Sequence, residues 1–303
     1  MSQLRHDPLS GHDVIVAEGR AARPTTFAST SPDGAGIDGC PFCEGHESRT
    51  PPELARTGPG APGTPGWRVR VFPNLYPIVE RHEVVVLSPD HSRSFAELDD
   101  AEAVEVVTMW RDRARAQLDD GAAYSVAILN HLRGAGASIA HPHAQIFGLD
   151  LVPPAVTAAI ARTHDAGHDL VAADATRERL TVARDDMVVW CPHASTVPYQ
   201  VRVAHPAAGA RFDEADDATV ANTALALRDA LARLRAVLGD PPYNVVVRTA
   251  PPGGAPFHWY VDVIPRVSVI AGFEQATDIL VNTIPPEAAA QALNDVDARR
   301  EPL

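Results

Sequence analysis

Two long segments of the chain carry apolar residues at every third or fourth position, and each opens with acidic residues. This spacing is typical of amphipathic helices, and acidic residues in the first turn favour a helix N-terminus. It predicts one helix that ends near Leu118 and another that ends near Leu238. The residues expected to face the core are Val104, Val107, Trp110 and Ala114 in the first helix, and Val220, Leu227, Leu231 and Leu234 in the second.

Short runs rich in β-branched and aromatic residues lie on both sides of these helices. They cover residues 83–87, 123–129, 200–203 and 242–248, and two further runs that begin at His141 and His258. Such runs predict strands when Pro, Gly, Asn or Asp residues bound them. Helices that follow antiparallel strand runs predict an α+β fold in layers.

These elements occur twice along the chain. His141 and His258 stand 117 positions apart, and the phenylalanines that precede the two helices have the same separation. A constant offset between different kinds of element indicates a duplicated unit. We therefore expect two tandem halves, residues 1–168 and 169–303, which share one antiparallel sheet with helices packed on it.

The charge and composition exclude several functional classes. All 26 basic residues are Arg, which rules out both a P-loop lysine and a lysine Schiff base. The net charge of −13 would repel a nucleic-acid backbone. No apolar run is long enough to cross a bilayer, and the polar N-terminus lacks the apolar region of a signal peptide. We expect a cytoplasmic protein that binds neither nucleic acid nor membrane.

The residues that indicate chemistry fall in two places. His141, His143 and Gln145 alternate in an extended segment, so we expect one strand to present all three on one face. Cys40 and Cys43 form a Cys-x-x-Cys pair, which supplies half of a tetrahedral metal site that a nearby His could help to complete. The sequence thus indicates a zinc-braced enzyme that forms a covalent bond through histidine.

Only the first half retains this set of side chains. In the second half, Tyr260 and Asp262 take the positions of His143 and Gln145. We therefore expect a symmetric scaffold in which only the first copy is active. The first copy also has a run of small residues at 130–138, which is either a flexible turn or a loop whose backbone N–H groups approach an anion.

Six segments in order resemble the galactose-1-phosphate uridylyltransferase family, a duplicated branch of the histidine-triad superfamily. The match extends from about residue 4 to about residue 290, and the segments read "RHDPLSGHDVIVAEGRAARP", "CPFCEG", "RVFPNLYP", "RHEVVVLSPDHS", "NHLRGAGASIAHPHAQ" and "FHWYVDVIPR" with "AGFE". The resemblance implies two histidine-triad-like halves in one chain. It also implies a homodimer whose site borrows residues from the partner subunit.

The resemblance implies one structural zinc per chain, with the ligands Cys40, Cys43, His91 and His141. Two thiolates and two imidazoles make a closed tetrahedral site, which suits a structural metal. The alternative is a pair of buried free thiols. Some family members bind a second metal through closely spaced histidines in the C-terminal half. This chain has Tyr260, Asp262 and Ile264 there, so no second metal is expected.

His143 matches the family's nucleophile, which as neutral imidazole attacks the α-phosphorus of a nucleotide sugar. The resemblance implies that phosphate and nucleotide are contacted by Arg20, Arg23, Asn74, Asn130, Gly136 and Ser138, and the hexose hydroxyls by Glu274. Gln145 replaces the third His of the hydrolytic branch. It leaves a donor to the phosphoryl oxygen but removes a proton carrier, which favours transfer to a sugar phosphate over hydrolysis.

The function expected from these residues is uridylyl exchange between UDP-glucose and galactose 1-phosphate, a step of galactose metabolism, with ping-pong kinetics through a nucleotidyl-histidine. The partners would be a nucleotide sugar and a hexose 1-phosphate. An alternative within the family is a phosphorylase that passes adenylyl from ADP-glucose to inorganic phosphate. A non-catalytic nucleotide-binding module is a third possibility, although a module that only binds needs no nucleophile.

Overall fold

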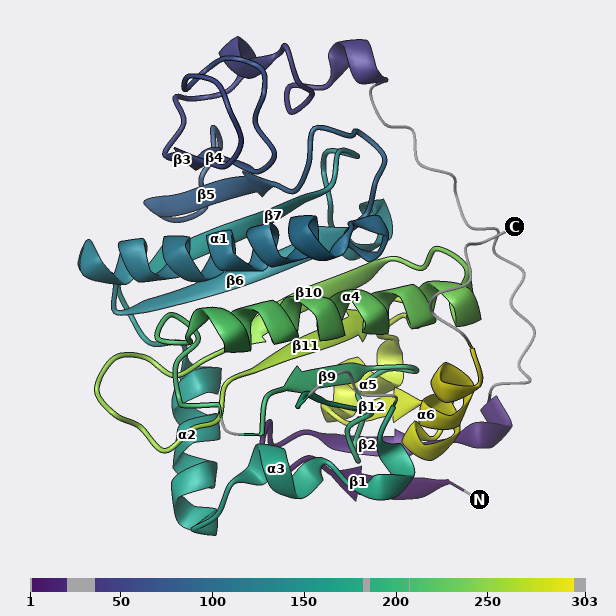
Figure 1. The fold of residues 1–303 in the computed structure, drawn as a ribbon. Coiled ribbons are helices and arrows are strands. Elements are labelled where there is room, and N and C mark those ends of the chain that lie inside the picture. Colours follow the sequence, from purple (N-terminus) through teal and green to yellow (C-terminus); the bar gives the residue numbers. More distant parts are fainter. Residues whose placement is uncertain (1, 21–35, 182–185, 207, 297–303) are drawn as a thin grey trace.

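The computed structural model describes residues 2–20, 36–181, 186–206 and 208–296, which form two β-sheets with helices packed around them (Figure 1). The nine-stranded sheet has the order β3-β4-β5-β7-β6-β10-β11-β9-β8, and the three-stranded sheet has the order β1-β2-β12. All pairings in the larger sheet are antiparallel. The predicted α+β fold with a shared antiparallel sheet is confirmed.

The elements have the following bounds. The strands are β1 (Gln3–His6), β2 (Asp13–Val16), β3 (Ala55–Arg56), β4 (Arg70–Pro73), β5 (Arg81–Val86), β6 (Tyr124–His131), β7 (His143–Leu149), β8 (Val188–Trp190), β9 (Val201–Ala204), β10 (Tyr243–Arg248), β11 (Tyr260–Pro265) and β12 (Leu280–Asn282). The α-helices are α1 (Asp100–Asp119), α2 (Pro154–Ala166), α3 (Leu170–Asp174), α4 (Asp217–Leu238), α5 (Gly272–Thr277) and α6 (Pro286–Asp295). Short 3₁₀ turns include η1 (Glu18–Arg20) and η5 (Arg133–Ala135). No helix in the described ranges is long and apolar enough to cross a membrane.

The two halves of the chain meet at the centre of the large sheet. β6 of the first half pairs with β10 of the second, and Asn130 lies opposite Asn244 in this register. The strands on either side of this pair come from the two halves separately. The expected boundary at residues 168–169 lies in the short connection between α2 and α3.

Helices α1 and α4 lie side by side on one face of the large sheet (Figure 1). The Asp99 carboxylate caps α1 by accepting from the N–H of Glu102, and Asp216 caps α4 in the same way. The predicted inward residues of both helices are buried, except Val104, which is half-buried at the edge of the core. Both helices end within one residue of the predicted positions.

Alternation along the strands leaves a second, polar face on the sheet. Ala144 and Ile146 of β7 belong to the core beneath the helices, so His143 and Gln145 point to the opposite face. By the same alternation, the residues that share this face are His82 of β5, Asn130 of β6 and Asn244 of β10. The candidate chemistry therefore gathers on the face that α1 and α4 do not cover.

Three strand boundaries differ from the prediction. The strand expected from His141 begins at His143, because Pro142 has no backbone N–H to donate to the ladder. The strand expected from His258 begins at Tyr260, and Trp259 instead donates its backbone N–H to Gly209. The strand expected to stop before Asn130 continues to His131. His141 thus precedes the strand, and the prediction that one strand carries all three side chains is wrong.

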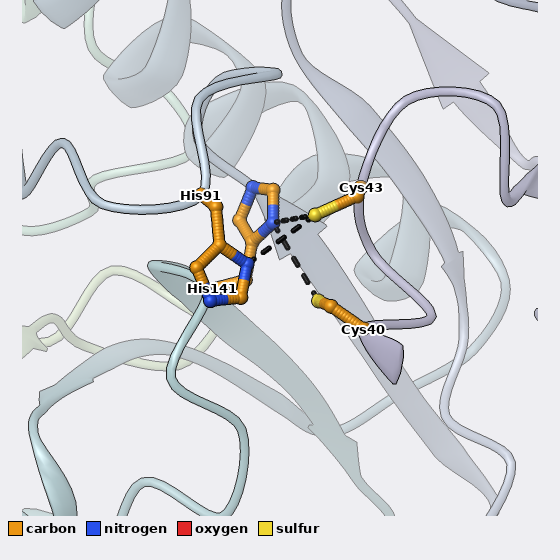
Figure 2. Close-up of side chains that lie close together, drawn as sticks. All are labelled: Cys40, Cys43, His91 and His141. Atoms are coloured by element: carbon orange, nitrogen blue, oxygen red, sulfur yellow. Dashed lines mark hydrogen bonds between the residues drawn. The ribbon is translucent and has the colours of Figure 1, made fainter. Parts of the chain in front are cut away.

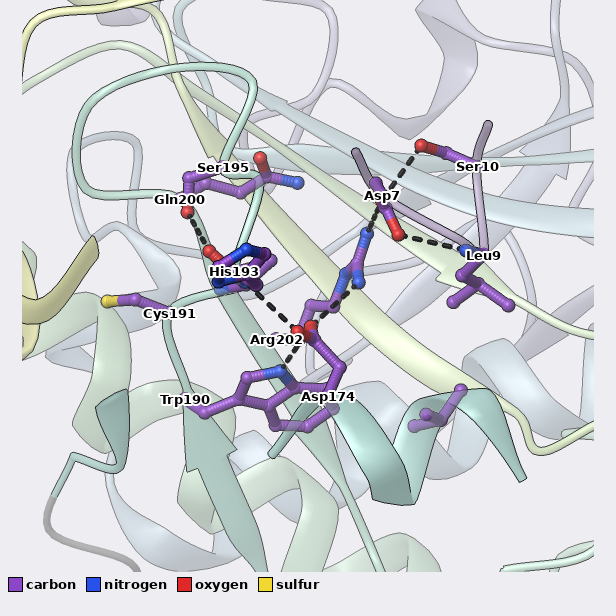
Figure 3. Close-up of polar contacts among 12 residues, drawn as sticks. Asp7, Leu9, Ser10, Asp174, Trp190, Cys191, His193, Ser195, Gln200 and Arg202 are labelled. Carbon is purple, nitrogen blue, oxygen red and sulfur yellow. Dashed lines mark hydrogen bonds and ion pairs between the residues drawn. The ribbon is translucent and has the colours of Figure 1, made fainter. Parts of the chain in front are cut away.

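A buried ion-pair network ties the N-terminal segment to the second half of the chain (Figure 3). The Arg202 guanidinium donates to Asp7 at 2.7 Å and to Asp174 at 3.2 Å, and all three side chains are at most 7% exposed. Burial by itself raises the pKa of Asp7, but the charge and hydrogen bonds of Arg202 outweigh it and hold the pKa below 3.8. The network fixes the loop that follows β1.

Candidate functional site

Four side chains from three segments of the first half converge on one point (Figure 2). The ligand atoms of Cys40, Cys43, His91 and His141 all lie within 4.8 Å of one another. The Cys43 Sγ lies 3.3 Å from His91 Nδ1 and 3.6 Å from His141 Nδ1, and Cys40 Sγ lies 3.8 Å from His141 Nδ1. The structure brings together all four residues that the sequence suggested as metal ligands.

This geometry fits a tetrahedral zinc ion. With zinc–sulfur and zinc–nitrogen bonds of about 2.3 and 2.0–2.1 Å, a tetrahedral angle separates the two ligand atoms by about 3.6 Å. The observed separations of 3.3 to 3.8 Å bracket that value. The donor set also fits, because two thiolates and two imidazoles suit zinc and leave no open position for substrate.

The surroundings orient His141 for this role. Its Nε2 donates to the carbonyl oxygen of Ser88 at 2.8 Å, so Nδ1 is left with its lone pair facing the cysteines. Burial, the largest effect, lowers the pKa of His141 to about 4 and keeps the ring neutral. Burial and the nearby Cys40 raise the pKa of Cys43 to about 11, and a bound cation is what would favour its thiolate.

His143, two residues later, is buried at the start of β7 and aimed at the polar face. Its Nδ1 donates to the carbonyl oxygen of His141 at 2.8 Å, which leaves Nε2 as the free lone pair. Phe42 packs edge-on against the ring with centroids 5.2 Å apart. Burial lowers the pKa of His143 below 6.5, so the imidazole is neutral near pH 7.

The loop before β7 places polar groups beside this imidazole. Asn130, His141 and His143 line one small pocket together with Leu132 and Ala137. The loop contains Gly136 with φ of 95°, a conformation that suits glycine. Gly136 and Ser138 are both exposed. Asn74 lies near the same face of the sheet, since its Nδ2 is 3.1 Å from the Nε2 of His82.

A family model described as a domain of unknown function, DUF4921, matches residues 113–301, which is more than half of the chain. The chain belongs to this family. It is 28% identical over 328 residues to ADP-glucose phosphorylase of Arabidopsis thaliana, covering 97% of this chain and 93% of that protein. It is 30% identical over 166 residues to galactose-1-phosphate uridylyltransferase of Streptomyces lividans, covering 50% of this chain and 39% of that protein.

Among solved structures, the fold is similar to a crystal structure of an ADP-glucose phosphorylase from Arabidopsis thaliana with bound ADP-glucose. The TM-score is 0.86 at 28% identity, over 98% of this chain and 99% of that one. These matches confirm the resemblance found in the sequence: the DUF4921 protein is similar to the galactose-1-phosphate uridylyltransferases. These relatives are thus a phosphorylase and a uridylyltransferase.

Three predicted contacts lie away from this site or beyond what the structure describes. Glu274 of α5 lines a different cavity, of about 320 Å³, and its carboxylate accepts the backbone N–H of Ala271. Arg20 ends η1, but its side chain is not described. Arg23 lies outside the described residues. The structure therefore brings together the predicted site residues of the first half, apart from Arg20 and Arg23, but not Glu274.

The cavity beside Glu274 occupies, in the DUF4921 protein, the place in the second half that corresponds to the His143 site. Asp262 accepts there from Gln200 at 2.8 Å and lies next to Tyr260 and Arg202. His258 is held between the carbonyl oxygen of His205 and the carboxylate of Asp169. In the second half, the Tyr260 phenol and the Asp262 carboxylate thus stand at the positions that His143 and Gln145 occupy in the first half.

Sequence reasoning missed His82, which contacts the candidate site directly. Its Nε2 lies 2.7 Å from the Oε1 of Gln145, and its ring stacks on Phe147 with centroids 4.2 Å apart. His82 stands in the "RHEVVVL" segment but carries no recognisable spacing to the other histidines. Pairing of β5 with β7 places His82 opposite Phe147, two residues after Gln145. Knowledge of that strand pairing would have identified His82 as a neighbour of Gln145.

Proposed function

We propose that this protein transfers a nucleotidyl group between a nucleotide sugar and a phosphate acceptor through a covalent bond to His143. The observation that carries this proposal is the hydrogen bond from His143 Nδ1 to the carbonyl oxygen of His141. It fixes the tautomer in which Nε2 is an unprotonated nucleophile on the polar face of the sheet. Asn130 lines the same pocket as His143, and Gln145 follows two positions later on the same face of β7.

In the first step, the Nε2 lone pair of His143 forms a bond to the α-phosphorus of the nucleotide sugar. The bond from that phosphorus to the bridging oxygen breaks, and hexose 1-phosphate leaves with the electron pair. The Nδ1 proton stays on the ring, where the His141 carbonyl oxygen stabilises the positive charge that develops. In the second step, an oxygen of the acceptor phosphate attacks the same phosphorus and the electron pair returns to Nε2.

We propose that the metal held by Cys40, Cys43, His91 and His141 is zinc, with one ion per chain. A closed site of this kind supplies folding energy and leaves no position for a reacting group. Its contribution to the reaction is positional, since His141 is both a ligand and the residue that holds His143 by its backbone oxygen.

ADP-glucose as nucleotidyl donor and inorganic phosphate as acceptor are the substrates that we favour. The support is the similarity to an ADP-glucose phosphorylase over nearly the full length of both chains. Uridylyl exchange between UDP-glucose and galactose 1-phosphate is the second candidate. It is favoured by the higher identity of 30% to a galactose-1-phosphate uridylyltransferase, although over 50% of this chain.

We also propose a homodimer in which Glu274 contacts the substrate held by the partner subunit. The support is that Glu274 lines a cavity other than the one beside His143. Apolar residues near Glu274 are exposed, Val269 by 87% and Phe273 by 47%, as expected of a surface that another chain covers. The exposed Gly136 and Ser138, with Asn74, would then bind the nucleotide phosphates.

The test is to incubate the protein with ADP-glucose or UDP-glucose labelled at the α-phosphorus, without an acceptor. One nucleotide sugar should leave about one equivalent of label per site on the wild type and release an equal amount of hexose 1-phosphate. Inorganic phosphate or galactose 1-phosphate should then remove the label, and the one that does so identifies the acceptor. Continuous release of nucleoside monophosphate without a burst would instead identify a hydrolase.

A further inference from the structure

Two amide side chains on the polar face of the sheet have their carbonyl oxygens occupied by neighbours. Gln145 Oε1 lies 2.7 Å from His82 Nε2, and Asn130 Oδ1 accepts from Asn244 Nδ2 at 2.7 Å. Within the described residues, neither the Gln145 nor the Asn130 amide nitrogen has a protein acceptor. An amide whose oxygen is held on one side must present its N–H₂ group on the other.

The hydrogen bonds of His82 fix which of its nitrogens carries the proton. The backbone N–H of Ile78 donates to His82 Nδ1 at 3.3 Å, so Nδ1 is an acceptor and Nε2 carries the hydrogen. Only that tautomer can donate to the oxygen of Gln145 over 2.7 Å. Burial lowers the pKa of His82, which favours this neutral form, and stacking on Phe147 holds the ring plane.

Asn74 supplies a further consequence of this tautomer. Its Oδ1 accepts the backbone N–H of Tyr76 at 2.8 Å, and its Nδ2 lies 3.1 Å from His82 Nε2. Because His82 Nε2 donates to Gln145, it has no lone pair to accept from Asn74. The Asn74 amide nitrogen therefore remains as a donor for a ligand on the same face.

Asn244 plays the same part for Asn130 from the other half of the chain. Its Nδ2 donates to Asn130 Oδ1 and also to the backbone oxygen of Ala135 at 2.8 Å, so both of its hydrogens are used. These bonds fix the side chain of Asn130 and the η5 turn together, across the junction between β6 and β10. Asn130 lines the same pocket as His143.

We propose that His82 and Asn244 are positioning residues, which turn the N–H₂ groups of Gln145 and Asn130 toward the phosphoryl oxygens at His143. This rests on the proposed nucleotidyl transfer. Donors that are already oriented stabilise the charge that develops at a phosphoryl group without reorganising first. Since Asn244 belongs to the second copy, the half without a nucleophile would contribute to the site of the half that has one.

The experiment is a set of double-mutant cycles on the single-turnover rate at which labelled nucleotide sugar modifies His143. His82→Phe keeps an aromatic ring against Phe147 but removes the donor, and Gln145→Ala removes the amide. Each should slow labelling by about 10- to 100-fold, and the double variant should be no slower than Gln145→Ala alone. Asn244→Leu with Asn130→Ala should behave in the same way.

The crossed pairs are the matched controls. His82→Phe with Asn130→Ala, and Asn244→Leu with Gln145→Ala, share no hydrogen bond and should multiply their separate losses. If the substitutions act only through a general structural defect, the losses in labelling rate should multiply in all four double variants. That result would overturn the proposal. His82→Gln should recover most of the rate, because Gln200 makes the equivalent donation to Asp262 in the second half at 2.8 Å.

A spectroscopic measurement tests the orientation without relying on activity. The side-chain ¹⁵N chemical shifts of His82 should show a proton on Nε2 and a lone pair on Nδ1 near pH 7. The opposite tautomer would overturn the proposal even in an active enzyme. If the wild type shows the expected tautomer but takes up no label from any nucleotide sugar, the proposed nucleotidyl transfer is wrong. The same double-mutant cycles, measured on the dissociation constant for ADP, then decide whether the two amides face a phosphate.

Discussion

His143 donates its Nδ1–H to the carbonyl oxygen of His141 over 2.8 Å, so the backbone of a candidate metal ligand holds the candidate nucleophile. His141 is held in turn by the carbonyl oxygen of Ser88. The candidate metal site and the Nε2 of His143 are thus connected through one residue, His141, and we expect loss of a bound metal to lower activity indirectly, by moving His143.

We expect about one zinc ion per chain in the purified protein, measured by mass spectrometry of the metal. Cys40→Ser should lose this zinc and lower the melting temperature, because a closed site organises the loops that it joins. Cys191→Ser is the control, since Cys191 is a buried thiol outside the four-residue group and its loss should leave the zinc content unchanged. Undiminished zinc in Cys40→Ser would contradict the ligand assignment.

His143→Ala should lower nucleotidyl transfer by about 10³-fold or more while the protein stays folded, because it removes the covalent acceptor. Its circular dichroism and melting curve serve as the control for folding. In His143→Gly, added imidazole should recover part of the rate by entering the vacated space. Transfer at the wild-type rate without imidazole would rule out nucleophilic catalysis at this residue.

Gln145→Glu should keep the acceptor for His82 but replace the donor on the other side by a negatively charged oxygen. We expect transfer to fall by about 100-fold or more, because a carboxylate repels the phosphoryl group that the amide would bind. Folding should be little affected, since the His82 hydrogen bond remains available. A variant as active as the wild type would show that this position does not face the phosphate.

Asp7→Asn should lower the free energy of unfolding by about 3–5 kcal/mol near pH 7, because it leaves the buried Arg202 charge without this partner. Asp150→Asn is the control, since that carboxylate is 74% exposed and water screens its pair with Arg81, so its loss should change the free energy of unfolding far less. Urea unfolding of the two variants measures the difference.

The same ion pair predicts a dependence on pH. The folded pKa of Asp7 lies below its ordinary value of 3.8, so the pair stabilises the fold above that value and the stabilisation is lost as pH falls through the folded pKa. The wild type and Asp7→Asn should therefore differ by a constant amount from pH 8 to about pH 5 and converge below about pH 4. A difference that shrinks above pH 6 would contradict this.

The sequence predicted the elements whose signal is local or repeated. Trp110 and Leu227 fall on the inner faces of helices with regular spacing, and the close Cys40 and Cys43 indicated half of a metal site. His91 and His141 were expected as the other two ligands only from the family resemblance. The repeat predicted the shared antiparallel sheet. These signals depend on residue type and spacing, which are visible in one dimension.

The remaining features depend on contacts between distant segments. His82 and Gln145 are 63 positions apart, and Asp7 and Arg202 are 195 positions apart. The first contact depends on the register of β5 against β7, and the second on how the loop after β1 packs against β9, and neither can be inferred from the sequence unless these pairings are known. The start of β7 at His143 has a local cause instead, since Pro142 has no backbone N–H to donate to the ladder.

The pairing of β6 with β10 makes the chain resemble two subunits joined by a permanent tether. Such a tether keeps the second copy at a high effective concentration, whatever the amount of protein in the cell. The surface of the second copy at the β6–β10 junction must be preserved, but its other residues can change without separating the two halves. Tyr260 and Asp262 of β11 lie outside the β6–β10 pair and differ from His143 and Gln145, whereas Asn244 lies within the pair, opposite Asn130.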